Sequence, residues 1–303
     1  MMNRNRFIRF DWAAKHMLRN KADFVIFEGL ISVLVNEKVT IEELLESESN
    51  KESKSDKFNR VDIKAKNSKG EIIIVEIQQT RELDYLQRMV YGVAKTITEH
   101  MKSGMSYQHV RKIYSINILY FNLGEGADYL YHGQTKLVGV HTDDTLKLTD
   151  YERNDLRVLE PKDVFPEYYV IRVNNFDEMA VTPLEEWMQY LKDEYIKPDT
   201  TAPGLKEARE RLEYLRMSPE EQREYDYYLD TLVRDTDVIK TQILEAEIKG
   251  RKEGEEKGRK EGEEKGRKEE RIKNARNLKD NGVPLDLIAK SLGLSDDEIK
   301  LLQ

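Results

Sequence analysis

Residues 60–80, RVDIKAKNSKGEIIIVEIQQT, constrain the fold of this chain more than any other stretch. An alternating apolar run and an Ile/Val-rich run flank the sequence NSKG, which is typical of a tight turn. The stretch therefore predicts a β-hairpin. The second strand carries Glu76 inside its apolar run, where a carboxylate is costly unless a partner stabilises the charge.

The segments around this hairpin alternate between helical and extended patterns. Apolar residues at helical spacing predict one or two helices within residues 10–37 and another within residues 81–104. In the latter helix, one apolar face is expected to be shared by Leu83, Leu86, Val90 and Val93. Residues 111–123 predict a central strand, and residues 128–161 predict a hairpin with edge strands. This order indicates an α/β or α+β domain.

From Pro183 onward the pattern becomes helical. Ser218 and Glu221 form the N-terminal capping signature of a helix. The octapeptide GRKEGEEK then occurs twice, from residues 250 and 258. Its charge pairs four residues apart favour a helix by ~0.2–0.5 kcal/mol each, whereas each glycine costs about 1 kcal/mol. A marginal helix or a flexible spacer is expected there, followed by a hairpin of two short helices.

Composition limits the setting in which the protein works. The chain has no cysteine, which excludes disulfides and thiolate metal sites and is expected of a cytoplasmic protein. Neither a secretory signal nor an apolar run of the about 18–20 residues of a membrane helix is visible, so no membrane partner is expected. The net charge is −8, yet residues 1–122 carry +4 and residues 123–303 carry −12. The more basic part is compatible with a nucleic-acid partner, because binding depends on the local field.

Asp62 and Glu76 are the candidate site residues of the hairpin. Glu76 and Gln78 are two residues apart and project from one strand face, and Asp62 on the preceding strand can reach the same region. Converging carboxylates repel each other unless a cation lies between them, and an all-oxygen ligand set favours Mg²⁺ or Mn²⁺ over Zn²⁺. The alternative interpretation is a solvated pair on an exposed sheet face.

In these residues the chain resembles the Rpn family of recombination-promoting nucleases and putative transposases, a branch of the PD-(D/E)XK nuclease superfamily. The resemblance rests on Asp62, on Glu76-x-Gln78 after the turn, and on the Gln-x-x-x-Tyr spacing of Gln87 and Tyr91 in the following helix. The N-terminal segment FDWAAKHML, the repeat and the final hairpin are also similar to that family.

The resemblance implies an α/β (α+β) fold, with a PD-(D/E)XK restriction-endonuclease-like core and a helical C-terminal extension. It implies a Mg²⁺-dependent (or Mn²⁺-dependent) DNA endonuclease linked to recombination or transposon-like DNA processing. Asp62 and Glu76 would hold the ion, and the implied catalytic set is Asp62, Glu76, Gln78, Gln87 and Tyr91.

Gln78 stands where most of the superfamily carries Lys, and a neutral amide cannot supply that positive charge. Lys64, on the same strand face as Asp62, is a candidate substitute. A second hypothesis is therefore a catalytically degenerate nuclease fold that acts as a DNA- or partner-binding module. Asp11 is either a helix N-cap before Trp12 or a site residue. The resemblance also allows Glu28 to be a further acidic contributor to the site, although a surface position on an amphipathic helix is the favoured interpretation.

We expect four segments: a nuclease-like domain (1–182), a helical region (183–249), a charged Gly/Lys/Glu linker (250–271) and a small helical hairpin (272–303). The C-terminal helices are expected to pair with a second copy, because a two-fold nuclease would cut both strands of a duplex symmetrically. A DNA-reading role for the terminal hairpin is disfavoured by its acidic sequence SDDEIK.

Overall fold

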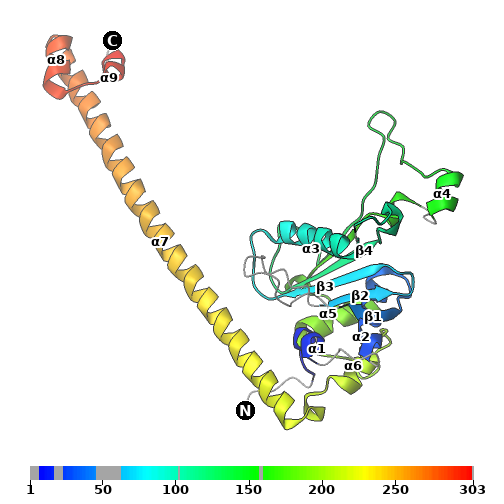
Figure 1. Cartoon of the computed structure of the whole chain (residues 1–303). Helices are drawn as coiled ribbons and strands as arrows, with labels where there is room; N and C mark the ends of the chain where they lie inside the picture. Colours follow the sequence, from blue (N-terminus) through cyan, green and yellow to red (C-terminus); the bar gives the residue numbers. More distant parts are fainter. Residues whose placement is uncertain (1–6, 17–22, 46–62, 102, 157–159, 302–303) are drawn as a thin grey trace. The chain divides into compact units, whose positions relative to one another are not determined.

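A computed structural model describes most of the chain: residues 7–16, 23–45, 63–101, 103–156 and 160–301 (Figure 1). The chain divides into two compact units, Met1–Gln222 and Arg223–Gln303. In the first unit, helices cover both faces of a six-stranded mixed sheet, which confirms the predicted fold class (Figure 1). The four segment boundaries inferred from the sequence stay predictions.

The sheet combines an antiparallel and a parallel part. Its strands are β1 Ile41–Leu45, β2 Ile63–Asn67, β3 Ile72–Gln78, β4 Ile113–Leu119, β5 Leu130–Gly133 and β6 Glu167–Arg172. Their spatial order is β1-β2-β3-β4-β6-β5, with β3, β4 and β6 parallel and the remaining pairs antiparallel. The expected hairpin is β2–β3, in which Ile63 pairs with Val75 and Gly70 adopts a positive φ of 77° in the turn. The expected central strand is β4, which is buried throughout.

Helices of the first unit, apart from α4, form two layers around this sheet. The helices are α1 Phe10–His16, α2 Phe24–Val35, α3 Tyr85–His100, α4 Asp150–Leu156, α5 Pro183–Asp193 and α6 Leu205–Arg211. Helix α3 lies on one face, and α1, α2, α5 and α6 lie on the other (Figure 1). In this second layer the Phe10 ring packs edge-on against Phe27 and Trp187, at centroid distances of 5.7 and 5.9 Å.

The buried face of α3 differs from the sequence prediction. Of the four residues expected on it, Val93 alone is buried; Leu83, Leu86 and Val90 are 92%, 58% and 60% exposed. The face that packs on the sheet consists of Tyr85, Met89, Gly92, Val93 and Thr96. The prediction was wrong because Tyr85, whose hydroxyl donates to Asn117 at 3.1 Å, outweighs the leucines in setting the rotation of the helix.

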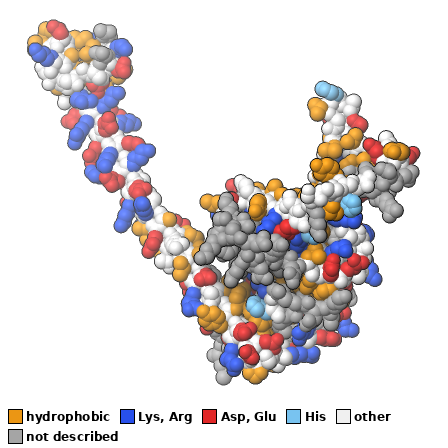
Figure 2. Space-filling view, viewed as in Figure 1, with side chains coloured by type: hydrophobic (Ala, Val, Ile, Leu, Met, Phe, Trp, Pro, Cys, Tyr) orange, Lys and Arg blue, Asp and Glu red, His pale blue; other side chains and the backbone are white. Residues whose placement is uncertain are grey.

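The second unit consists of the long helix α7 Pro219–Asp280 from Arg223 onward, with α8 Leu285–Leu292 and α9 Asp296–Lys300. The repeat is helical throughout, which agrees with the first of the two expected alternatives, a marginal helix; Lys/Arg and Asp/Glu side chains intersperse along it (Figure 2). One of its charge pairs joins Arg259 to Glu263 at 2.7 Å. Ser295 caps α9, as its sequence indicates, and Ala275 and Ile288 form a small core under α8. None of the helices in the described part of the chain has the length and hydropathy of a membrane span.

Candidate active site

The candidate site lies where the second half of β3 faces the first turns of α3. Ile72 and Ile74 pack with Val93 of α3, so the next alternate residues, Glu76 and Gln78, project from the same face. The run of β-branched residues makes β3 a central strand, and its parallel pairing with β4 is bridged by α3 as the crossover helix. The fold therefore places a carboxylate and an amide at a helix–sheet boundary.

Glu76 is a buried acid that faces a cation. It is only 4% exposed, and its Oε2 atom lies 3.4 Å from Nε of Arg88 on α3. A buried carboxylate remains ionised only beside a compensating charge, and the guanidinium supplies this charge. The unusual position of Glu76 within an apolar strand thus has a physical explanation that the sequence alone did not give.

Gln78 and Arg88 share a second acidic partner, Glu82. The amide Nε2 of Gln78 donates to Glu82 Oε1 at 2.9 Å. Nη1 of Arg88 donates to both carboxylate oxygens of Glu82, at 2.8 and 3.1 Å. Two carboxylates therefore hold one guanidinium, which fixes its plane. Sequence reasoning missed Glu82 and Arg88, although the need of Glu76 for a cation was a signal for a basic residue on the facing helix.

The structure describes some, but not all, of the other predicted site residues. Asp62 lies outside the described residues, directly before β2 in the sequence, so its meeting with Glu76 stays a prediction. Gln87 and Tyr91 lie on the exposed surface of α3, where Tyr91 is 49% exposed. Lys64 reaches Glu99 near the end of α3, with 2.6 Å between Nζ and Oε2. This pairing occupies the strand lysine considered as a substitute for the missing charge at position 78.

Asp11 and Glu28 make structural contacts. Asp11 is 2% exposed; its Oδ1 accepts from the backbone N–H of Trp12 at 2.8 Å, and its Oδ2 accepts from the amide of Gln79. Gln79 points away from α3, as the alternation predicts. Glu28 is half-buried rather than on the surface, and its Oε1 accepts from the backbone N–H of Ile41 at 2.7 Å. It ties α2 to the first strand.

The donor set at the site is compatible with a hard cation. Within the described residues no group of three or more His, Cys, Asp or Glu side chains is arranged to hold a metal ion. Glu76 nevertheless offers a buried carboxylate whose oxygens suit Mg²⁺ or Mn²⁺, and an ion there would compete with the guanidinium of Arg88, 3.4 Å from Oε2. Glu76 and, by prediction, Asp62 would hold such an ion.

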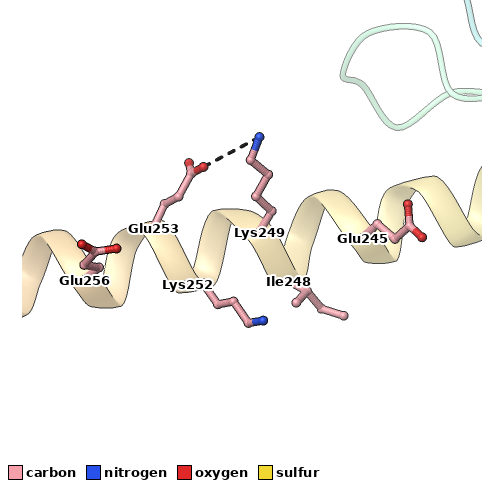
Figure 3. Close-up of a pocket in the computed structure, with 6 residues that line it drawn as sticks. All are labelled: Glu245, Ile248, Lys249, Lys252, Glu253 and Glu256. Carbon is pink, nitrogen blue, oxygen red and sulfur yellow. Dashed lines mark ion pairs between the residues drawn. The ribbon is translucent and has the colours of Figure 1, made fainter.

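Two surface hollows lie elsewhere. One, of about 440 Å³, is bounded by residues that include Thr200, Arg209 and Arg216. The other follows the side of α7, where Lys249 and Glu253 form an ion pair of 3.9 Å beside Ile248 (Figure 3). Side chains of a single helix with both signs of charge line the latter, so neither its shape nor its charge suits an active site.

A Glu-x-Gln element on the central strand of a mixed sheet, with its crossover helix packed against it, defines a nuclease-like α/β protein. The chain belongs to the PD-(D/E)XK nuclease family transposases, whose family model matches residues 8–242. The match confirms the resemblance noted in the sequence and supports a nuclease- or transposase-like function. No curated protein and no solved structure matches the chain.

Proposed function

We propose that this protein is a divalent-metal-dependent DNA endonuclease that acts in recombination or transposon-like DNA processing. The observation that carries the proposal is the buried carboxylate of Glu76 at the boundary of β3 and α3, in a chain of a nuclease family. Asp62 and Glu76 are the proposed metal ligands. Gln78, Gln87 and Tyr91 are the other proposed site residues.

The residues support distinct parts of phosphodiester hydrolysis. A Mg²⁺ or Mn²⁺ ion held by carboxylates polarises a phosphoryl oxygen and lowers the pKa of bound water. Gln78, whose amide is oriented by Glu82, is suited to direct a water molecule or to donate to a phosphate oxygen. Gln87 and Tyr91 present polar groups on the exposed surface of α3, where a DNA backbone can approach.

The test combines metal binding with DNA cleavage. Calorimetry with Mn²⁺ should detect binding to the wild-type chain and not to Glu76→Gln, and EDTA should stop nicking of supercoiled plasmid. We expect Glu76→Gln to lose more activity than the roughly 100-fold that loss of a second-sphere metal partner costs. Glu43→Gln, an exposed carboxylate on β1 of the same sheet, is the matched control and should cleave like the wild type.

The alternative is a nuclease fold that binds DNA or a partner without cleaving. It is favoured by the neutral amide of Gln78, which donates to Glu82 and brings no positive charge to the strand. A wild-type chain that retards DNA in a gel but neither binds Mn²⁺ nor nicks plasmid would contradict the endonuclease and support this alternative.

A second copy of the chain is the proposed partner of α7. Leu232, Ile239 and Ala246 recur every seven residues, and a second series of Leu229, Thr236 and Ile243 lies three residues before them, at coiled-coil spacing. Together these residues form one apolar face of α7, the seam. Ile239 and Ile243 are 36% and 54% exposed, as expected of side chains that a second helix would cover. A homodimer through α7 would present two nuclease units to one duplex.

Light scattering on the full chain tests the dimer. Ile239→Asp combined with Ile243→Asp should halve the mass, because two buried charges per chain would face the seam. Val238→Asp introduces the same charge at a 55% exposed position outside the seam and should leave the mass unchanged. A wild-type monomer, or equal masses for all three proteins, would contradict the proposed pairing.

A further inference from the structure

The face of β3 toward α3 lacks a cation of its own at the position where hydrolysis of a phosphodiester needs one. The amide of Gln78 is neutral and already donates to Glu82. Lys64 and Lys66, the basic residues on the same face of β2, are both paired: Nζ of Lys64 lies 2.6 Å from Oε2 of Glu99, and Nζ of Lys66 lies 3.6 Å from Oε1 of Glu43. Any positive charge that meets a phosphate beside Glu76 must therefore come from another element.

Helix α3 brings such a charge to Glu76. The guanidinium of Arg88 lies 3.4 Å from Glu76 through Nε and is held by Glu82 through two contacts of Nη1, at 2.8 and 3.1 Å. Nε of Arg88 is buried against Glu76, but the side chain as a whole is 21% exposed, so part of the guanidinium is open to a ligand from solvent. Glu82 thus acts as an anchor for a guanidinium whose other edge faces the candidate site.

We propose that Arg88 is a catalytic residue that supplies, from α3, the positive charge missing at position 78. The inference rests on the proposed endonuclease function. A divalent ion on Glu76 would remove the need for Arg88 to neutralise this carboxylate. The donors of Arg88 would then be available to a non-bridging oxygen of the scissile phosphate, while Glu82 keeps the guanidinium in place.

The charge acts during the displacement at phosphorus. A water oxygen bonds to phosphorus, the bond from phosphorus to the leaving oxygen breaks, and the proton released by the water passes to solvent. A solvent molecule returns one proton to the leaving oxygen, so atoms and charge balance. The non-bridging oxygens carry the most negative charge midway, where a fixed guanidinium stabilises them.

Arg88→Gln and Arg88→Lys in the full chain test this role with two readouts. Arg88→Gln should lower the single-turnover rate of plasmid nicking by about 10²–10³-fold, the effect of losing one donor to a developing oxyanion. Its Mn²⁺ affinity, measured by calorimetry without DNA, should stay equal to or exceed that of the wild type, because a cation that competes for Glu76 has been removed. Arg88→Lys should recover part of the lost rate, since it restores the charge but not the fork of donors.

Lys95→Gln, which removes a cation two turns further along α3, is the matched control and should leave both readouts unchanged. Wild-type nicking by Arg88→Gln, or loss of Mn²⁺ binding and of thermal stability without rescue by Lys, would overturn the inference and leave the endonuclease intact. A wild-type chain that neither binds Mn²⁺ nor nicks DNA would instead overturn the proposed function, and this inference with it.

Discussion

A buried ion pair at the other end of the sheet provides a sharp test of the energetics of the first unit. Glu167, the first residue of β6, is 5% exposed, and its Oε2 lies 2.7 Å from Nζ of Lys112. Its Oε1 accepts from the Tyr169 hydroxyl at 2.8 Å and lies 2.6 Å from Nε2 of His132. Burial alone would raise the pKa of Glu167, but hydrogen bonds from Lys112, Tyr169 and His132 outweigh it and hold this pKa below its usual value.

The perturbation is Lys112→Met. The side chains of Lys112 and Glu167 are 8% and 7% exposed, so solvent screens the pair little. Loss of Lys112 leaves the buried carboxylate of Glu167 with Tyr169 and His132 as partners of Oε1 but without the ammonium at Oε2, and breaking a buried pair in this way costs about 3–5 kcal/mol of unfolding free energy. With a urea slope of about 2–3 kcal/mol per M, the unfolding midpoint should fall by on the order of 1–2 M.

Tryptophan fluorescence reports the urea unfolding of the first unit alone, because both tryptophans of the chain, Trp12 and Trp187, are buried in this unit. Lys162→Met is the control: it breaks a pair with Glu160 of similar length, 2.8 Å, whose side chains are 44% and 57% exposed. This control should not move the midpoint measurably. A midpoint for Lys112→Met equal to that of the control would refute the reasoning.

The same pair predicts a pH dependence with a defined sign. The pKa of Glu167 is lower in the folded chain than in the unfolded one, so the unfolded state binds the proton more readily. The stabilisation is complete above the unfolded pKa of about 4.3 and is lost as pH falls through the lowered folded pKa. Glu167→Gln should therefore show a flatter decline of the urea midpoint in this acidic range than the wild type.

Two further predictions concern the backbone. Gly29→Ala places a Cβ against the carbonyl oxygen of Pro203 and should lower the free energy of unfolding, measured with urea, by about 1–3 kcal/mol or more. Gly258→Ala meets open space on α7 and should slow hydrogen exchange of its helical neighbours by about fivefold. Equal stabilisation by both substitutions would contradict the close packing of α2. Thr182→Ala removes the acceptor for the Glu185 N–H at the start of α5 and should cost about 1 kcal/mol in the same urea assay, while Thr182→Ser should cost less.

Sequence reasoning succeeded where the signal is local. The hairpin β2–β3 follows from the turn NSKG and its flanking apolar runs, and the caps at Ser218 and Ser295 follow from Ser-x-x-Glu spacing. Sequence reasoning missed contacts between residues that lie far apart in the chain. Nothing near Glu167 in the sequence indicates Lys112, because β4 and β6 become neighbours only when the sheet forms.

The missed cation of the candidate site has a related, geometric cause. At 3.6 residues per turn, the predicted apolar face of α3, centred on Leu86 and Val90, lies about 180° from Arg88. The face that packs on the sheet contains Tyr85 and Met89, and Arg88 lies within about 90° of its centre. Because the hydroxyl of Tyr85 binds Asn117, the neighbour of Glu76 on β4, the same contact that fixes the rotation of α3 brings Arg88 over Glu76. One wrong assumption about the helix face therefore hid the residue that stabilises the buried carboxylate.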